Sequence, residues 1–268
     1  MLSVSSVSYS IGHKRILHNI SATFRQGEFN MILGQNGSGK SSFLRLFSGE
    51  IGHYSGTVLY GNKNIRELRT EHLARVRAVM SQQPVLSFPL TVEEVVMMGR
   101  YPHFNFSPQK TDIAVCDEVI SKMNLGAFRQ RNYLTLSGGE KQRVHFARVL
   151  AQVWPDETGR QEDRTRYLFL DEPLASLDIA YQQEFLQIAR SFRSAGNTVL
   201  IAVIHDLNLA SQYGDRLFFL KEGELAASGK PADILSEELI EKVFGVRTAV
   251  ITNPVDGSRL VVYRPENR

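Results

Sequence analysis

The feature that most constrains the fold is a glycine-rich stretch, Gly34-Gln35-Asn36-Gly37-Ser38-Gly39-Lys40-Ser41, with the spacing G-x-x-x-x-G-K-S. It follows an apolar run of strand length, 29–33, and precedes residues of helical spacing that stop at Gly49. A strand, a glycine loop and a helix in this order predict a P-loop, whose backbone N–H groups and helix N-terminus face an anion. The sequence therefore predicts a nucleoside triphosphate site.

Each residue type in this loop has a physical role. Glycines let the backbone curl around a phosphate chain, Lys40 is long enough to reach the β- and γ-phosphates, and the Ser41 hydroxyl can coordinate Mg²⁺. The residues predicted to contact the nucleotide from this stretch are Gly34, Asn36, Gly37, Ser38, Gly39, Lys40, Ser41 and Ser42.

The composition restricts the remaining possibilities. Across 268 residues, 43% hydrophobic and 22% charged content are ordinary for a globular protein with a core. The formal charge of +3 does not point to nucleic acid, although it suits a protein beside an anionic membrane face. Cys116 is the single cysteine, so a disulfide or a cysteine metal site within the chain is excluded. Without a signal-like start or a membrane-length apolar run, we expect a soluble intracellular chain.

The rest of the chain predicts an α/β protein in which a helical block interrupts the alternation of strands and helices. The predicted strands are 2–9, 16–24, 56–61, 77–80, 167–170, 198–204 and 217–220. The predicted helices are 91–98, 110–123, 231–235 and 236–244, and a hairpin is predicted from 250–251 and 260–262 around Asp256-Gly257. We predict a core from 1–84 and 155–245, a helical subdomain over about 85–154, and a β-hairpin extension over 246–268.

Two adjacent carboxylates, Asp171 and Glu172, end the apolar run that begins at Leu168. Buried strands seldom carry adjacent acids unless these meet a cation, because unpaired buried charge is costly. We predict that Asp171 holds Mg²⁺ and that Glu172 polarises the attacking water as general base. The simpler interpretation is a strand that emerges into solvent.

The segment Leu136-Ser137-Gly138-Gly139-Glu140-Lys141-Gln142-Arg143 holds a second anion-binding signal. Ser137 and Glu140 have capping-box spacing, which predicts a helix start but does not explain the glycines between them. Each glycine weakens a helix by up to about 1 kcal/mol relative to alanine. An anion approaching the bare backbone accounts for both glycines. Because 34–41 already cradles one phosphate chain, we expect this anion to be the γ-phosphate on another copy.

With these motifs in this order, residues 2 to 245 resemble the ATP-binding cassette (ABC) ATPases. The resemblance implies a P-loop NTPase core with an antiparallel β subdomain and an inserted helical subdomain, acting on ATP with Mg²⁺ as a homodimer. It implies that Tyr9, otherwise a half-buried strand tyrosine, stacks on adenine. It also implies that Gln82 senses Mg²⁺ and the γ-phosphate, although neighbouring Gln83 leaves the register open.

Two further positions take roles from the same resemblance. Asp178, in Ser176-Leu177-Asp178, matches the D-loop that crosses to the partner subunit. His205 matches the switch histidine that contacts the γ-phosphate, a role that the sequence alone does not favour over that of a strand-end histidine. The departures from the family pattern are a longer charged loop over 155–166 and Leu174-Ala175 before the D-loop.

Within the family, 98–103 and 205–210 resemble importers of iron chelates, cobalamin and haem, and the tail 238–265 resembles the ATPase of bacterial haem importers. This implies haem import, two permease subunits, an indirect periplasmic haem-binding protein and a peripheral location on the cytoplasmic face of the inner membrane. The alternatives are an importer ATPase for ferric siderophores or cobalamin, and a soluble ABC ATPase that is not part of a transporter. In the family, the aromatic segment 100–106 lies near the permease; the alternative is ordinary packing of the helical block.

Overall fold

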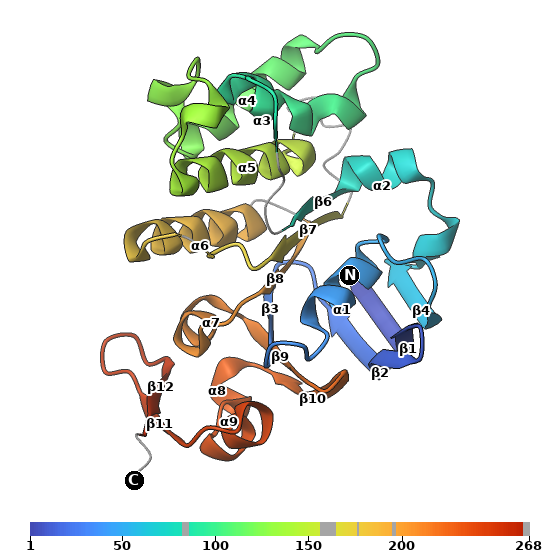
Figure 1. Cartoon of the computed structure of the whole chain (residues 1–268), viewed down its shortest axis with the longest axis vertical. Coiled ribbons are helices and arrows are strands. Elements are labelled where there is room, and N and C mark those ends of the chain that lie inside the picture. Colours follow the sequence, from blue (N-terminus) through green and yellow to red (C-terminus); the bar gives the residue numbers. More distant parts are fainter. Residues whose placement is uncertain (82–85, 156–164, 176, 195–196, 265–268) are drawn as a thin grey trace. The chain divides into compact units, whose positions relative to one another are not determined.

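The computed structural model describes residues 1–81, 86–155, 165–175, 177–194 and 197–264. Predictions on Gln82, on Ser176 and on most of the charged loop lie outside these residues. The chain divides into two compact units. The first unit combines Met1–Glu67 with Val199–Arg268, and the second is Leu68–Thr198. In Figure 1 the first unit therefore holds both the blue N-terminal strands and the orange to red C-terminal elements.

An antiparallel sheet forms the N-terminal part of the first unit. Its strand order is β2-β1-β4-β5. The strands are β1 (Leu2–Ile11), β2 (Lys14–Phe24), β4 (Ser55–Tyr60) and β5 (Lys63–Asn64), and the 3₁₀ turn η1 (Ile65–Glu67) follows them. Buried residues recur on one side of β1 and β2, as a half-buried strand requires. The three strands predicted here are confirmed.

A second sheet places the P-loop. In it β3 (Phe29–Leu33) pairs in parallel with both β8 (Thr198–Val203) and β9 (Arg216–Lys221), and β9 pairs in antiparallel fashion with β10 (Glu224–Gly229). All five residues of β3 are buried, as expected for an inner parallel strand. The loop after β3 leads into α1 (Lys40–Phe47).

Aromatic packing holds α1 on its sheet. The Phe24 ring lies 5.4 Å from that of Phe47 and 4.6 Å from that of Phe218, measured between centroids. Phe43 and Phe47 meet edge to face at 5.0 Å. Such pairs add about 0.5–1.5 kcal/mol each beyond the area that they bury. The helix behind the P-loop is therefore rigidly supported.

Besides β8, β9 and β10, the described C-terminal part of the first unit contains three short helices and a hairpin. They are α7 (Leu207–Tyr213), α8 (Pro231–Ile234), α9 (Glu237–Phe244), β11 (Thr248–Thr252) and β12 (Arg259–Tyr263). The predicted tail hairpin is confirmed, with Val250 opposite Val261 in its register.

The second unit is mainly helical. Its elements are α2 (Thr70–Val76), β6 (Arg77–Met80), α3 (Val92–Met97), η2 (Met98–His103), α4 (Lys110–Lys122), η3 (Gly126–Phe128), η4 (Tyr133–Thr135), α5 (Gly138–Val153), β7 (Arg166–Asp171) and α6 (Ile179–Ser194). Strands β6 and β7 pair in parallel. Helices α5 and α6 pack through stacked rings of Phe146 and Phe185, 3.9 Å apart. The boundaries predicted at 84 and 154 stay predictions.

Candidate functional site

The loop between β3 and α1 has the backbone that a phosphate cradle needs. Gly34, Gly37 and Gly39 have φ angles of 152°, 80° and 98°, which only glycine adopts without strain. A Cβ atom at Gly34 would overlap the backbone carbonyl of Leu220 on β9. The neighbouring strand therefore requires glycine at this position.

Lys40, the first residue of α1, is 5% exposed, and its side chain reaches back to the start of the loop. Its Nζ donates to the carbonyls of Gly34 and Gln35, each at 2.9 Å. The hydroxyl of Ser38 is buried and has no hydrogen-bond partner among the described residues. An ammonium group and an orphaned hydroxyl inside a cradle of N–H groups fit a polyphosphate, which supplies several acceptor oxygens.

Segments far away in the sequence anchor the loop. The N–H of Gly223 donates to the Ser38 carbonyl at 3.1 Å, and the Gly223 carbonyl accepts from the His18 N–H at 2.8 Å. On the other side, Nε2 of Gln35 donates to the Phe244 carbonyl at 2.8 Å, where α9 ends. The cradle is therefore held from both β2 and the C-terminal elements.

Tyr9 lies one strand away from the loop. It pairs with Leu17 across β1 and β2, and the Leu17 side chain lies against Gly39. Tyr9 is half-buried. Adenine stacking on Tyr9 stays a prediction.

The predicted carboxylate pair ends a fully buried strand, β7. Asp171 is 4% exposed. Glu172 has a φ of 50°, the left-handed region that a glutamate rarely adopts. The sequence predicts an extended backbone at Glu172 instead, because Glu172 precedes Pro173 and a residue before proline favours the extended region. Such a conformation costs about 1–3 kcal/mol and recurs at functional sites, where surrounding structure imposes it.

The start of α5 has the predicted capping box. Oγ of Ser137 accepts from the Glu140 N–H at 3.3 Å, and Oε2 of Glu140 accepts from the Ser137 N–H at 2.7 Å. This hydrogen bond holds the pKa of the Glu140 carboxyl below its usual value. Among the described residues outside this helix and the chain neighbours of each glycine, no atom lies within 4 Å of the position that a Cβ would take at Gly138, and at Gly139 only the Leu177 side chain does, at 3.9 Å. Packing within the chain therefore does not require these glycines, and the first turn is open to an outside group.

Two hydrogen bonds connect α5 and α6 to the segment that follows the carboxylates. Nε2 of Gln142 donates to the Pro173 carbonyl at 2.9 Å, one residue after Glu172. Oδ1 of Asp178 accepts from the Tyr181 N–H at 3.0 Å and so caps α6. The Gln142 contact therefore connects α5, which begins at Gly138, to the segment after Glu172 within the second unit. The sequence did not predict this contact.

His205 lies between β8 and α7 and is exposed. The next residue, Asp206, caps α7 by accepting from the N–H groups of Asn208 and Leu209 at 2.8 and 2.9 Å. The predicted residues thus fall into two groups. The first unit holds Tyr9, the P-loop and His205, and the second holds Asp171, Glu172, Ser137, Gly138, Gly139 and Asp178.

Ser41 on α1, in the first unit, and Asp171 on β7, in the second, each carry an oxygen atom of the kind that Mg²⁺ prefers. Among the described residues, no group of three or more His, Cys, Asp or Glu side chains is placed to hold a metal ion. A magnesium–nucleotide site needs no such cluster, because Mg²⁺ takes one or two carboxylates and the substrate phosphates. The chemistry of each residue therefore fits Mg²⁺ beside a bound nucleotide, and a shared Mg²⁺ site stays a prediction.

The second unit also contains an apolar groove of about 790 Å³ beside α3 and η2. Its apolar lining is Met97, Tyr101, Phe104, Phe106, Pro108 and Ile113. Phe106 is fully exposed and Tyr101 is 58% exposed, which is unusual for large aromatic side chains. This groove coincides with the aromatic segment singled out in the sequence.

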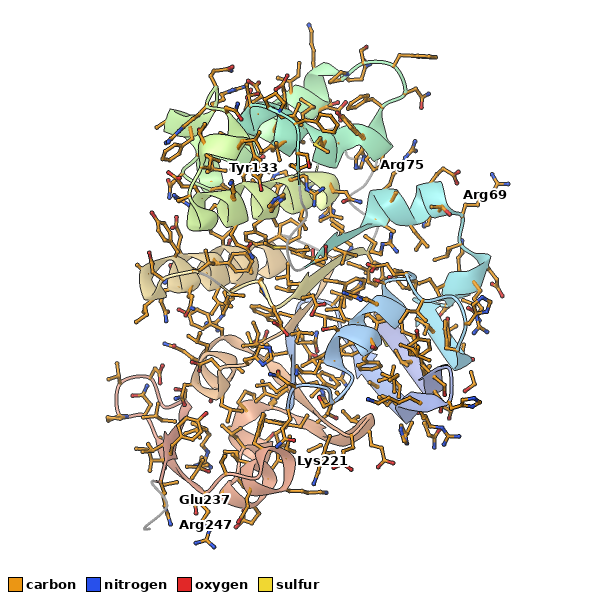
Figure 2. All side chains as sticks on the ribbon, viewed as in Figure 1. Arg69, Arg75, Tyr133, Lys221, Glu237 and Arg247 are labelled. Atoms are coloured by element: carbon orange, nitrogen blue, oxygen red, sulfur yellow. The ribbon has the colours of Figure 1, made fainter. Side chains whose placement is uncertain are left out.

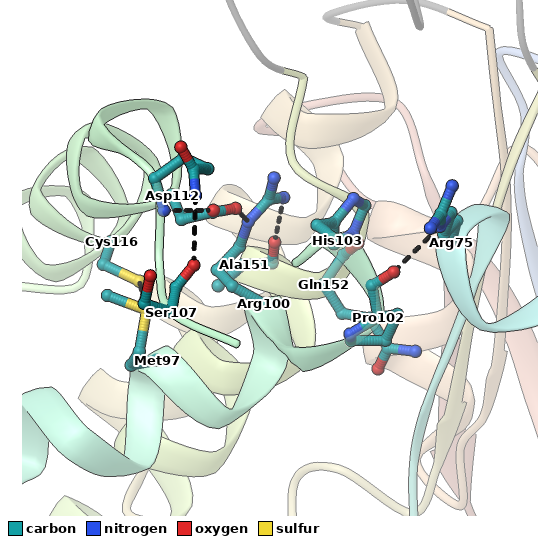
Figure 3. A network of polar contacts seen from close by, with 11 residues as sticks. Arg75, Met97, Arg100, Pro102, His103, Ser107, Asp112, Cys116, Ala151 and Gln152 are labelled. Atoms are coloured by element: carbon teal, nitrogen blue, oxygen red, sulfur yellow. Dashed lines mark hydrogen bonds and ion pairs between the residues drawn. The ribbon is translucent and has the colours of Figure 1, made fainter. Parts of the chain in front are cut away.

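A polar network connects η2, which carries Tyr101 of the groove, to α4 and α5 (Figure 3). Nε of Arg100 contacts Oδ1 of Asp112 at 2.9 Å, and its Nη1 donates to the Ala151 carbonyl on α5 at 2.9 Å. Nε2 of His103 contacts the Gln152 carbonyl at 2.8 Å. The groove is therefore tied directly to the helix that begins with the glycine turn. The sequence did not predict this, because a lone arginine after an apolar helix carries no signal of burial.

Among the described residues, no helix is both long enough and apolar enough to cross a membrane.

Comparisons with known proteins agree with these features. The family model described as ABC transporter matches residues 17–175. Two relatives are named hemin import ATP-binding protein HmuV. The one from Mesorhizobium japonicum is 42% identical and covers 98% of each chain. The one from Escherichia coli O157:H7 is 37% identical and covers 98% of this chain and 99% of its own.

Solved structures have the same fold. A chain of an ABC transporter in an inward-facing conformation matches with a TM-score of 0.81 at 22% identity, over 100% of this chain and 98% of that one. The cbiO1 chain from Clostridium perfringens, part of the cbiONQ transporter complex, matches with a TM-score of 0.74 at 27% identity, over 90% and 92%. A dimeric bacterial ABC transporter cassette matches with a TM-score of 0.71 at 25% identity, over 86% and 98%.

Proposed function

This chain belongs to the ABC transporter family, and from that premise we propose that it hydrolyses ATP to drive haem import through a separate permease. The observation that carries the haem proposal is the match to hemin import proteins over 98% of both chains, tail included. The family predicted from the sequence motifs is confirmed.

ATP binding would begin at the P-loop. The Lys40 ammonium donates to two carbonyls of its own loop, and a triphosphate offers it charged acceptors in their place. Charge-assisted hydrogen bonds are roughly twice as strong as neutral ones, so this exchange favours binding. Tyr9 would stack on the adenine ring, and the N–H groups from Gly34 to Ser42 would hold the phosphates.

Hydrolysis would depend on Glu172, His205 and Gln82. Glu172 would take a proton from the attacking water, His205 would contact the γ-phosphate, and Gln82 would sense Mg²⁺ and the γ-phosphate. Mg²⁺, held by Ser41, Asp171 and Gln82, would neutralise charge on the phosphates. The left-handed backbone of Glu172 supports this assignment, because such strain is typical of a side chain aimed by its surroundings.

A second copy of the chain would complete each site. Gly138 and Gly139 lie in the first turn of the 16-residue helix α5. The described residues do not pack against the space that side chains at these two positions would occupy, apart from Leu177. Backbone N–H groups there can bind the γ-phosphate on the partner's P-loop, with Asp178 at the same interface. The dimeric cassette among the structural relatives supports this arrangement.

The groove beside η2 would receive a cytoplasmic segment of the permease. We expect the complex to contain two permease subunits, to lie on the cytoplasmic face of the inner membrane, and to receive haem from a periplasmic binding protein. An aromatic groove backed by a buried ion pair offers apolar contact area on a firm support, which suits an inserted helix.

Phe106→Asp is expected to prevent co-purification with the permease and to leave the ATPase rate of the isolated subunit unchanged. A charge in the groove opposes apolar contact, while Phe106 itself is fully exposed and supports no core. Val255→Asp is the matched control, since Val255 is 89% exposed on the hairpin turn. If Phe106→Asp and Val255→Asp recover equal amounts of permease, the groove does not receive the permease segment.

The cargo is tested by growth. A strain without this gene is expected to fail when iron is supplied only as haem and to grow on a ferric siderophore or a simple salt. Wild-type protein should restore growth on haem, and Glu172→Gln should not. Unimpaired growth on haem, in a strain without a second haem importer, would refute haem as the cargo. Loss of growth on the siderophore, or of cobalamin uptake, would reassign it.

A further inference from the structure

The Asn208 side chain forms two hydrogen bonds between helix α7 and the C-terminal hairpin, beside a longer contact of 3.5 Å from Gln212 to Asp256. Nδ2 of Asn208 donates to the Val261 carbonyl at 3.2 Å, and its Oδ1 accepts from the Val261 N–H at 2.7 Å. The amide thus satisfies both backbone groups of one β12 residue, as a neighbouring strand would. Two hydrogen bonds from one amide set orientation as well as distance.

The helix held in this way begins next to His205. Asp206, which follows His205, caps α7 through the N–H groups of Asn208 and Leu209. The helix has only seven residues, and an isolated helix of that length does not form in water. The direction of α7, and with it the position of His205, must therefore come from tertiary contacts.

The hairpin is in turn fixed to α9 and, through it, to the P-loop. Oε1 of Glu237, a residue labelled in Figure 2, accepts from the Val250 N–H at 3.3 Å and lies 3.4 Å from Nη2 of Arg264. At the other end of α9, the Phe244 carbonyl accepts from Gln35 of the P-loop at 2.8 Å. The hairpin thus connects the two segments of the first unit that carry the proposed phosphate contacts.

We propose that Asn208 is a positioning residue for His205, and that the hairpin β11–β12 sets the rate of ATP hydrolysis without touching the nucleotide. This inference rests on the proposed role of His205 in hydrolysis. Misplacing a catalytic group by about 1 Å costs up to about a hundredfold in rate, so a lost clamp is measurable.

Steady-state kinetics on the full-length protein test the proposal. Asn208→Ala is expected to lower kcat for ATP about tenfold while KM stays within about twofold, because the P-loop keeps its own anchors. In a His205→Ala background, Asn208→Ala should cause no further loss, since the residue that it positions is gone. Gln212→Ala removes only a longer contact, 3.5 Å from Nε2 of Gln212 to Oδ2 of Asp256 in the hairpin turn, and should keep kcat close to that of wild type because the Asn208 clamp remains.

A second variant separates positioning from folding. Asn208→Asp is nearly isosteric and keeps the acceptor for Val261, but its carboxylate cannot donate to the Val261 carbonyl. We expect a smaller loss of kcat with the melting temperature within a few degrees of wild type, again abolished by His205→Ala.

The outcomes are distinguishable. Equal fold losses of kcat from Asn208→Ala in both backgrounds would make the hairpin a structural support only and overturn the proposal. If Asn208→Ala keeps wild-type kcat while His205→Ala is slow, the positioning role of Asn208 is overturned. The proposed role of His205 in hydrolysis would then still stand. Wild-type kcat in His205→Ala would instead refute the role of His205.

Discussion

The Glu172→Gln protein is expected to bind ATP and to hydrolyse it about 10²–10⁴ times more slowly than wild type, the usual contribution of general base catalysis. The amide cannot accept the proton of the attacking water, while the P-loop and Asp171 stay intact. ATP should therefore trap the protein as a dimer. The measurements are the steady-state ATPase rate and ATP-dependent dimer formation by size-exclusion chromatography.

Glu222 provides a matched control for this change. It also follows an apolar strand and has a φ of 49°, but its side chain is exposed and lies in the β9–β10 turn. Glu222→Gln should hydrolyse ATP at the wild-type rate. Lys40→Ala should fail to bind ATP productively and should form no dimer. If the Glu172→Gln protein turns over like wild type, Glu172 is not the general base.

Asp112→Ala is expected to lower the free energy of unfolding by about 3–5 kcal/mol, the usual cost of leaving one member of a buried ion pair alone. Arg100 and Asp112 are 1% and 2% exposed, so water cannot replace the lost carboxylate. Asp112 also accepts from the Gln109 N–H at 2.9 Å and so caps α4. Urea denaturation of the purified protein measures the change.

Asp117→Ala on the same helix is the control. Asp117 pairs with Arg129 at 2.6 Å but is 47% exposed, and an exposed pair contributes about 0–1 kcal/mol. The double variant Arg100→Met with Asp112→Leu should recover much of the loss, because no unpaired charge remains buried. Equal destabilisation by Asp112→Ala and Asp117→Ala would contradict this account of the pair.

The fold class predicted from the sequence, an ABC ATPase with parallel and antiparallel sheets and a helical subdomain, is confirmed by the solved relatives. The motif residues were recognisable because their signals are local. A capping box needs only residues such as Ser137 and Glu140, three positions apart, and the structure contains both of its hydrogen bonds. The same holds for the P-loop spacing and for the Asp256-Gly257 turn.

Local sequence also determined which residue types carry chemistry, but not how they are held. The left-handed backbone of Glu172 contradicts the preference of a residue before proline, so only its surroundings impose it. The burial of Arg100 depends on Asp112 and on the Ala151 carbonyl, 51 positions away in the sequence. The clamp between Asn208 and Val261 joins residues 53 positions apart. Such contacts leave no periodic or short-range pattern, because each partner is an ordinary polar group until the chain brings the two together.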